Sequence, residues 1–454
     1  MAEQMMQEAA GKAIPAGYQQ TEVGVIPEDW STPTINEITN NIIDYRGRTP
    51  KKLGMEWGGG NILALSAGNV KKGFIDYRAE CYFGSDELYR KWMTSGHAQK
   101  DDIVFTMEAP LGNAALIPDE KRYILSQRTV LLQIAKSKIN PKFIIQYFLS
   151  DLFQKYISDC ATGSTAQGIK RATFEQMFVA VPLRLEEQTA IANVLSDSDA
   201  LIDALEQLIA KKQAIKSATM QQLLTGRTRL PQFALREDGT PKGTKPSELG
   251  EIPEDWEVGA IGDSCRTYSG GTPSTSNKNF YGGGIKWITS SDLNQGVIHD
   301  VAGRITDAGL NGSSAKLVEA HTLLIALYGA TAGVCAITRI SAAINQAVLA
   351  IVPAEHNSEY LFYWFTRHKE VIIETYTQGG QPNLSGDIVR SIKLAFPPVN
   401  EQTAIATILS DMDAEIQALE QRLGKTLQIK QGMMQELLTG KTRLIKPSKE
   451  VIHE

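Results

Sequence analysis

The stretch EQTAIANVLSDSDALIDALEQLIAKKQAIKSATMQQLLTGRTRL, residues 187–230, returns as EQTAIATILSDMDAEIQALEQRLGKTLQIKQGMMQELLTGKTRL, residues 401–444. The two copies are offset by 214 residues without a gap, and 28 of their 44 positions are identical. This offset is far longer than the period of about 20–50 residues that solenoid repeats have. The sequence therefore predicts duplication of a whole unit, in which one globular module is joined to one long helix.

Each copy of the repeat has the signals of a long helix. Glu187 and Glu401 stand where acidic residues suit a helix N-terminus, and Gly226 and Gly440 stand where glycine ends a helix. About 38 residues at 1.5 Å each predict a rod of roughly 57 Å. Apolar residues spaced by threes and fours predict a heptad seam. The seam is interrupted by polar residues at Ser198, Lys212, Thr426 and Lys430. Its apolar members are Ile191, Val194, Leu201, Leu205, Leu208 and Ile215 in the first helix, and Leu409, Met412, Ile416, Leu419, Leu423, Met433 and Leu437 in the second.

The charges of the two helices predict how they pair. Each helix is acidic in its first half, as at Asp199 and Asp413, and basic further on, as at Lys216 and Lys430. Parallel pairing would place like charges together, whereas antiparallel pairing places acidic halves against basic halves. We therefore expect one antiparallel coiled coil within the chain, with a pseudo-two-fold axis relating the two modules.

The modules begin with VGVIPEDW, residues 23–30, and LGEIPEDW, residues 249–256, whose tryptophans are expected to be buried anchors. Short apolar runs with Gly and small polar turns, followed by a helix rich in aromatic residues, predict a mixed α+β fold for each module. The expected segments are an N-terminal segment (1–17), the first module (18–185), the first helix (186–226), a polar linker (227–248), the second module (249–399), the second helix (400–440) and a tail (441–454).

Composition limits the classes of function. No run of about 18 apolar residues or signal-peptide pattern is found in the sequence, and the four cysteines stand far apart. This pattern is typical of a cytoplasmic protein with reduced thiols. The net charge of −5 argues against nucleic-acid binding by charge alone, unless basic residues are local or a partner supplies them.

The sequence lacks the motifs of several catalytic sites. It has no GxxxxGK[ST], GxSxG or HExxH pattern, no Cys/His metal spacing and no methyltransferase tetrapeptide of the NPPY or DPPY type. We therefore expect no catalytic residues, no metal site and no cofactor site in this chain.

Four features together resemble one family over nearly the whole chain. They are the IPEDW start of each module, WITSSDL at residues 287–293, a Gly loop before a strand that ends in Pro, and EQTAIA leading to LLTG and TRL. The family is the specificity subunit of type I restriction–modification systems. The resemblance implies an α+β chain with two target-recognition domains, each of which reads one half of a split, asymmetric DNA sequence.

The same resemblance implies partners for the chain. The helices would set the length of the unread spacer and dock two methyltransferase subunits, which hold S-adenosylmethionine. Restriction subunits with ATP-dependent translocation would join that core. Two readers on a two-fold axis would also suit half-sites about 34–36 Å apart, and modules with different loops would read different half-sites.

Local polar and basic loops are the candidate DNA contacts, because Arg and Lys pair with guanine or phosphate, and Asn and Gln with adenine. In the first module they are Arg46, Arg48, Thr49, Lys51 and Lys52, then Ser66, Asn69, Lys71 and Lys72, then Ser164, Thr165, Gln167, Lys170 and Arg171. In the second module they are Arg266, Tyr268, Thr272, Ser274, Asn277 and Lys278, then Thr289, Ser290 and Ser291, then Gln381 and Asn383. Gln127 and Gln346 stand in equivalent places, without an assigned role.

Two other classes of function stay open from the residues alone. A protein–protein scaffold with two peptide-binding modules would agree with the negative net charge, although basic loops in matching positions favour double-stranded DNA. A stand-alone DNA-modifying enzyme is disfavoured, because cofactor motifs are missing.

Overall fold

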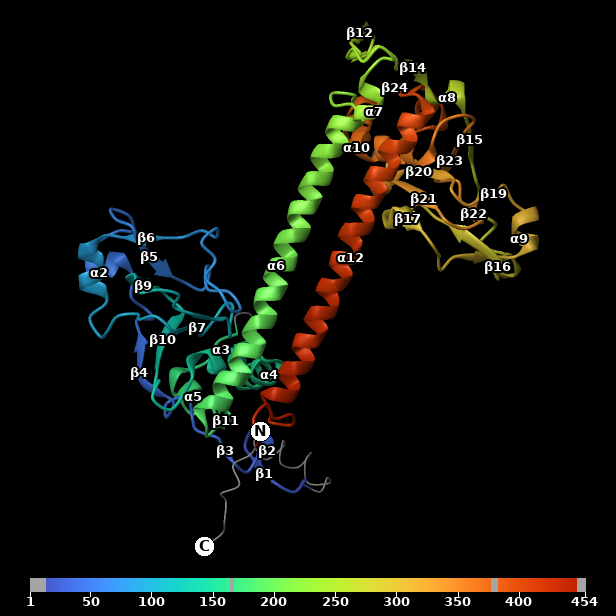
Figure 1. Cartoon of the computed structure of the whole chain (residues 1–454). Coiled ribbons are helices and arrows are strands. Elements are labelled where there is room, and N and C mark those ends of the chain that lie inside the picture. Colours follow the sequence, from blue (N-terminus) through green and yellow to red (C-terminus); the bar gives the residue numbers. More distant parts are fainter. Residues whose placement is uncertain (1–13, 164–166, 377–382, 447–454) are drawn as a thin grey trace. The chain divides into compact units, whose positions relative to one another are not determined.

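The computed structural model describes residues 14–163, 167–376 and 383–446 (Figure 1). The chain forms two compact units. The first consists of residues 1–206 and 422–454, and the second of residues 207–421. Each unit therefore contains one module and part of each long helix. In the described part of the chain, none of the helices has the length and apolar character needed to cross a membrane.

The module of the first unit is built on two small sheets. One has the order β4-β10-β7-β8 and is antiparallel; in the other, β6-β5-β9, the strands β5 and β9 are parallel. The hairpin β1-β2 and the pair β11-β3 frame the start of the module. The strands are β1 (Tyr18–Thr21), β2 (Gly24–Pro27), β3 (Trp30–Ser31), β4 (Thr39–Asp44), β5 (Ile62–Leu65), β6 (Phe83–Gly84), β7 (Ile103–Thr106), β8 (Ala114–Leu116), β9 (Tyr123–Leu125), β10 (Thr129–Ile134) and β11 (Val181–Pro182).

The helical run predicted after β10 is two helices in this module. Ser150 has extended backbone, and its side chain accepts a hydrogen bond from the amide of Phe153, so it ends one helix and caps the next. The buried aromatic face of this pair includes Phe143, Phe148 and Phe153. The helical elements are η1 (Pro50–Leu53), α2 (Asp86–Trp92), α3 (Pro141–Leu149), α4 (Asp151–Cys160) and α5 (Arg171–Glu175).

The module of the second unit repeats this plan with larger sheets. A five-stranded sheet has the order β15-β23-β20-β21-β17, and a four-stranded sheet the order β18-β16-β22-β19. The strands are β12 (Thr244–Ser247), β13 (Gly250–Pro253), β14 (Glu257–Ala260), β15 (Cys265–Ser269), β16 (Tyr281–Ile288), β17 (Val297–Ile298), β18 (Arg304–Ile305), β19 (Lys316–Val318), β20 (Leu323–Ala326), β21 (Cys335–Thr338), β22 (Ala342–Ile344), β23 (Val348–Pro353) and β24 (Lys393–Phe396).

Here the aromatic run after β23 is one continuous helix, α10. The segment 227–248, expected to be a polar linker, contains α7 and the strand β12, which pairs with β13. The helical elements are α7 (Pro231–Ala234), α8 (Ile261–Ser264), η2 (Lys278–Phe280), η3 (Asp292–Gln295), α9 (Asp307–Asn311), η4 (Gly329–Thr331), α10 (Ser358–Tyr376) and α11 (Gly386–Ser391).

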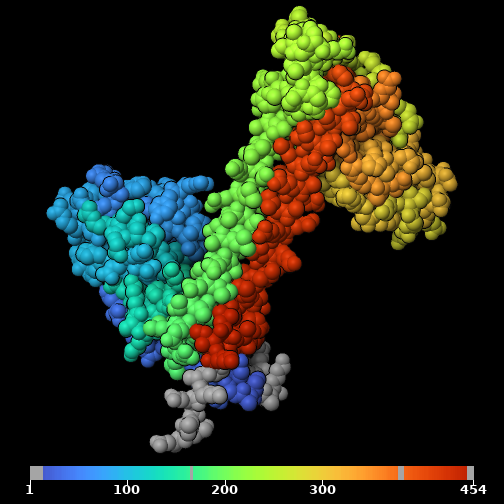
Figure 2. All heavy atoms as spheres, in the orientation of Figure 1, coloured from blue at the N-terminus to red at the C-terminus, as the bar shows by residue number. Residues whose placement is uncertain are grey.

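The two long helices, α6 (Leu185–Leu223) and α12 (Val399–Leu437), pair antiparallel within each unit (Figure 2). In the first unit, Lys430 of α12 forms an ion pair with Asp199 of α6. In the second unit, Lys212 of α6 lies 2.7 Å from Glu415 of α12, and Lys216 pairs with Asp413. Acidic residues near the start of one helix thus meet basic residues of the other, which confirms the predicted antiparallel coiled coil.

The seam predicted for α6 is wrong at three positions. Leu201, Leu208 and Ile215 are exposed by 39%, 39% and 42%, whereas Ile202 and Ile209 are buried in their place. Lys212, predicted as a polar interruption of the seam, does face α12, and so does Lys216, which was not predicted; both pair with carboxylates of α12. Because lysines occupy some of the seam positions, the apolar residues next to them in the sequence were mistaken for the seam. These apolar residues lie on the outer face of α6.

Each helix ends in a clasp on the IPEDW segment of the module in its own unit. Gly226 and Gly440 have φ of 68° and 69°, and a Cβ at either would lie 2.5 or 2.4 Å from the ring of Pro253 or Pro27. Trp30 and Trp256 are 2% and 1% exposed, which confirms them as buried anchors. The ion pairs of the two clasps are duplicated: Arg229 binds Asp255 (2.8 Å) and Glu401 (2.6 Å), and Arg443 binds Asp29 (2.7 Å) and Glu187 (2.5 Å).

The clasp of the second unit predicts a dependence of stability on pH. Burial alone would raise the pKa of Asp255, but hydrogen bonds from Arg229 and Lys242 outweigh it and lower the pKa to about 2. Since the unfolded value is about 3.9, the stabilisation is complete above that pH and is lost as the pH falls through 2. We expect wild type to exceed Asp255→Asn in free energy of unfolding by about 2 kcal/mol at pH 6, and by almost nothing near pH 2. Urea denaturation of both proteins measures this difference, and a difference independent of pH would contradict the assignment.

Candidate nucleic-acid interface

The candidate loops of the first module leave the strands at one edge, which we call the first loop edge. It consists of loops 45–52, 66–74, 107–113 and 126–128, together with residues 162–163 and 167–171. The amide of Ser126 donates to the carbonyl of Leu65 (2.8 Å) and the amide of Ile169 to that of Met107 (3.0 Å), so the loops contact one another. The strand register fixes the same edge: Val130 pairs with Asp44, Thr129 with Thr106, and Leu65 with Leu125.

The first of these loops uses most of its predicted contacts to hold its own shape. Arg46 forms a bidentate pair with Asp44, with Nε–Oδ1 and Nη2–Oδ2 distances of 3.0 and 2.8 Å. Burial opposes the charge of Asp44, but the hydrogen bonds from Arg46 prevail and its pKa is lowered. Arg48 donates to the carbonyl of Trp92, and Thr49 caps η1. Lys51 is exposed, whereas Lys52 donates to the carbonyl of Gly47 at 2.6 Å.

In the second loop, Asn69 does not present its side chain to a ligand. It is fully buried: its Nδ2 donates to the carbonyl of Ala64, and its Oδ1 accepts from the amide of Ser66, both at 2.8 Å. Asn69 therefore fixes the turn, and the prediction of a direct contact is corrected. Lys72, three residues on, is exposed, and Lys71 is half-buried.

Residues 168–171 meet the loop of residues 45–52 at a basic cleft of about 420 Å³. Arg46, Lys170 and Arg171 line this cleft, together with the carboxylate-bearing Glu108. Arg171 also donates to the carboxylate of Glu175 at 2.6 Å. Gln167 is exposed, while Ser164 and Thr165 lie outside the described residues. Two candidate groups that are far apart in the sequence are thus brought together in one cleft. Arg46 and Arg171 are already paired there with Asp44 and Glu175, whereas Lys170 makes no ion pair among the described residues.

Gln127 belongs to the first loop edge but has no role in the sequence prediction. It is exposed, and its Nε2 donates to the carbonyl of Arg48 at 3.3 Å. The available signal was its equivalence with Gln346, since both precede a strand that pairs with the strand of the basic loop.

The second module has an equivalent second loop edge, made of loops 270–278, 289–296, 327–333, 345–347 and 383–385. The amide of Gly271 donates to the carbonyl of Ile344 at 3.1 Å, and the amide of Asn345 to that of Ile288 at 3.1 Å. The strand register gives the same edge: Ser269 pairs with Leu349, Ala326 with Val348, and Ile288 with Ile344.

The candidates at the second loop edge are mostly hydroxyls and amides. Ser274 and Lys278 are exposed, and the side chain of Asn277 caps η2. Thr272 hydrogen-bonds to Gln346. Thr289 donates to Asp292 at 2.7 Å, beside the half-buried Ser290 and the exposed Ser291.

Three further candidates of the second module are placed differently. Arg266 and Tyr268 lie within β15, where the guanidinium is 5.1 Å from the centre of the Tyr268 ring. Asn383 forms a bridge with Tyr328 at the loop edge, and Gln381 lies outside the described residues. The two edges therefore have the same strand framework but different chemistry.

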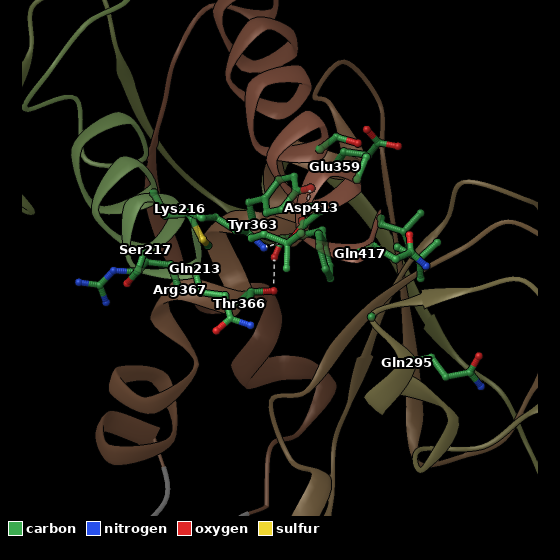
Figure 3. A pocket seen from close by; sticks show the side chains of 18 of the residues that line it. Gln213, Lys216, Ser217, Gln295, Glu359, Tyr363, Thr366, Arg367, Asp413 and Gln417 are labelled. Atoms are coloured by element: carbon green, nitrogen blue, oxygen red, sulfur yellow. Dashed lines mark hydrogen bonds and ion pairs between the residues drawn. The ribbon is translucent and has the colours of Figure 1, made fainter. Parts of the chain in front are cut away.

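A groove of about 910 Å³ lies in the second unit, where side chains from α6, α10 and α12 converge (Figure 3). Two ion pairs lie among its lining residues: Lys216 with Asp413, and Arg339 with Glu359 at 2.6 Å. Tyr363 donates to Asp413 at 2.8 Å, and burial together with that carboxylate raises its pKa. Within the described residues, no group of three or more His, Cys, Asp or Glu side chains could hold a metal ion.

Comparison with known proteins identifies the family. A family model described as the type I restriction modification DNA specificity domain matches residues 27–216 and 253–430. The putative type I restriction enzyme MjaX specificity subunit of Methanocaldococcus jannaschii is 26% identical over 443 residues, which cover 94% of this chain and 97% of that protein. The HindI specificity subunit of Haemophilus influenzae is 30% identical over 211 residues, 44% of each chain.

A solved structure has the same fold. The S subunit of a type I restriction–modification system from M. genitalium matches with a TM-score of 0.58 and 16% identity, over 90% of this chain and 96% of that chain. The family model covers both modules and most of both long helices. The chain therefore belongs to the family of type I restriction–modification specificity subunits, with two copies of the DNA specificity domain.

Proposed function

We propose that this chain is the non-catalytic DNA-reading subunit of a type I restriction–modification complex. Each module reads one half of a split, asymmetric site through its loop edge. The observation that supports this most is the shared framework: equivalent strands of both modules end in converging loops whose sequences differ. Two modules with the same strand framework but different loops are suited to bind two half-sites of different sequence.

The chemistry of the two edges agrees with this division. The first loop edge presents the exposed Lys51 and Lys72 beside the cleft of Arg46, Lys170 and Arg171. The three lysines make no ion pair among the described residues, so they are free to neutralise phosphates or to pair with guanine. The second loop edge offers mainly hydroxyl groups, which hydrogen-bond to phosphates or base edges. Partner subunits supply the remaining positive charge, because this chain has a net charge of −5.

We assign the helices two tasks. They set the distance between half-sites, and they dock two methyltransferase subunits that hold S-adenosylmethionine, with restriction subunits joining the complex. The exposed stripe of Leu201, Leu208 and Ile215 supports docking, since residues seven apart form one apolar line along a helix.

The role of the first loop edge is tested by the salt dependence of DNA binding. Mixed with its methyltransferase partner, the variant Lys51→Ala/Lys72→Ala is expected to bind more weakly to all sequences. Each lost phosphate contact lowers the slope of log Kd against log salt concentration by about 0.9, so the slope falls by roughly 1.8. Fluorescence anisotropy of labelled DNA, at salt concentrations from about 50 to 200 mM, measures this slope.

The matched control is Lys121→Ala. Lys121 is 80% exposed but precedes β9, so it lies at the end of the module away from the first loop edge. Its removal is expected to leave the slope unchanged. Equal slopes for all three proteins would show that the first loop edge does not face the phosphates.

A further inference from the structure

An aromatic cleft of about 520 Å³ opens at the first loop edge. Its walls include Trp57 and Tyr82, whose ring centres are 5.8 Å apart, and Trp92, which lies 5.5 Å from Trp57. Trp92 is completely buried and therefore closes the inner side, whereas Tyr82 is 43% exposed. Gln127 lines the same cleft. An aromatic wall and an exposed amide thus stand side by side at the first loop edge, in a cleft that Lys51 and Glu56 also line.

The hydrogen bond of Gln127 fixes the orientation of its amide. A backbone carbonyl only accepts, so the atom that contacts the carbonyl of Arg48 at 3.3 Å is Nε2. Within the described residues, Gln127 makes no other side-chain hydrogen bond, so Oε1 and the second N–H are available. An oxygen acceptor beside an N–H donor complements adenine, which offers its N6 amino group and N7 in the major groove.

The aromatic cleft complements the other base of such a pair. Thymine is the base that presents a methyl group in the major groove, and it is read by apolar contact. On the basis of the proposed DNA-reading function, we propose that Gln127 binds an adenine through N6 and N7. The C5-methyl group of a thymine in the same base pair, or in the next, then enters the cleft against Trp57 and Tyr82.

The second module is built differently at the equivalent place. The loop 270–278, which corresponds to loop 45–52 of the first module, is held by aromatic side chains. The indole N–H of Trp287 donates to the carbonyl of Gly271 at 3.4 Å, and the hydroxyl of Tyr281 donates to the carbonyl of Pro273 at 2.5 Å. Gln346 contacts Thr272 of the same loop. The adenine–thymine readout therefore belongs to the first module.

Two base analogues test the inference on the wild-type complex with its methyltransferase partner. Each thymine of the cognate site is replaced singly by uracil, which removes the methyl group alone. One replacement is expected to weaken binding about fourfold, the effect of one buried methyl group. Replacement of one adenine by 7-deazaadenine, which removes N7, is expected to weaken binding about tenfold. Fluorescence anisotropy gives each Kd.

Protein variants then assign these effects to residues. Trp57→Ala is expected to bind the thymine and uracil sites equally, and Gln127→Ala to bind the adenine and 7-deazaadenine sites equally. Phe83→Ala is the control: Phe83 is 42% exposed and directly follows Tyr82 at the start of β6, but it does not line the cleft. This variant should keep both discriminations.

The outcomes separate this inference from the function on which it rests. If wild type binds a split site but no thymine or adenine responds, or if the Trp57 and Gln127 variants discriminate as wild type does, the readout is wrong. If wild type binds no split site at all, the proposed function itself fails. The analogue arms use the unaltered protein, so a folding defect in Trp57→Ala does not affect them.

Discussion

Deleting residues 204–210 and 418–424 together is expected to shorten the unread spacer of the DNA site by about three base pairs. The two segments, ALEQLIA and ALEQRLG, correspond through the offset of 214 residues and lie at the middle of α6 and α12. Seven residues are one heptad, so the seam stays in register. The rod loses roughly 10.5 Å, which is close to three base-pair rises of about 3.4 Å.

The helical geometry of DNA adds a second expectation. Three base pairs also rotate one half-site by about 100° relative to the other, so the shortened protein should bind its best site more weakly than wild type binds its own. Selection from a DNA library with spacers of every length measures both the preferred spacer and the affinity.

The matched control deletes residues 204–210 alone. This change breaks the pairing between Lys212 and Lys216 of α6 and their carboxylates on α12, so assembly itself should suffer. If the double deletion still selected the wild-type spacer, the helices would not set the distance between half-sites.

Arg443→Ala is expected to destabilise the first unit by about 3–5 kcal/mol, the cost of leaving a buried charge without its partner. The side chain of Arg443 is 15% exposed, and its partners Glu187 and Asp29 are 2% and 18% exposed. These carboxylates raise the pKa of Arg443, so its charge persists at all working pH values. Without the guanidinium group of Arg443, the carboxylates of Glu187 and Asp29 would repel each other in a site with little access to water.

Hydrogen exchange of the full chain locates the damage. In Arg443→Ala, peptides from residues 14–206 should lose protection, while peptides from the second module keep theirs. Arg229→Ala should give the reverse pattern, because Arg229 forms the equivalent clasp with Asp255 and Glu401. Arg184→Ala, which removes an arginine 42% exposed, is the neutral control. Loss of protection in both units in every clasp variant would show that the clasps do not act locally.

The sequence predicted the elements that depend on local and periodic signals. The antiparallel pairing followed from charge, and the glycines after each helix have the left-handed backbone that was expected of them. The seam of α12 was predicted correctly at Leu409, Ile416 and Leu437. The repeat itself points to the correct seam of α6. Residues 409, 416 and 423 of the predicted α12 seam correspond, through the offset of 214, to residues 195, 202 and 209 of α6. Apolar periodicity within α6 alone was misleading.

Other features depend on tertiary contacts and could not be predicted. Asn69 resembles an exposed loop residue, but the hydrogen bond to Ala64 draws it into the core. Gln127 became a candidate because its hydrogen bond places it beside the loop of Arg48, 79 residues away in the sequence. The cleft of Arg46 with Lys170 and Arg171 likewise joins segments that only the folded sheets bring together.

The most direct test of a split DNA reader is methylome sequencing of cells that express the system with and without this chain. The proposed function predicts one bipartite motif, with two different half-sites and an unread spacer, methylated on both strands and lost when the chain is deleted. Exchange of loops 45–52 and 66–74 should alter one half-site and leave the other unchanged. A continuous motif, or a methylome that does not depend on this chain, would contradict the central claim.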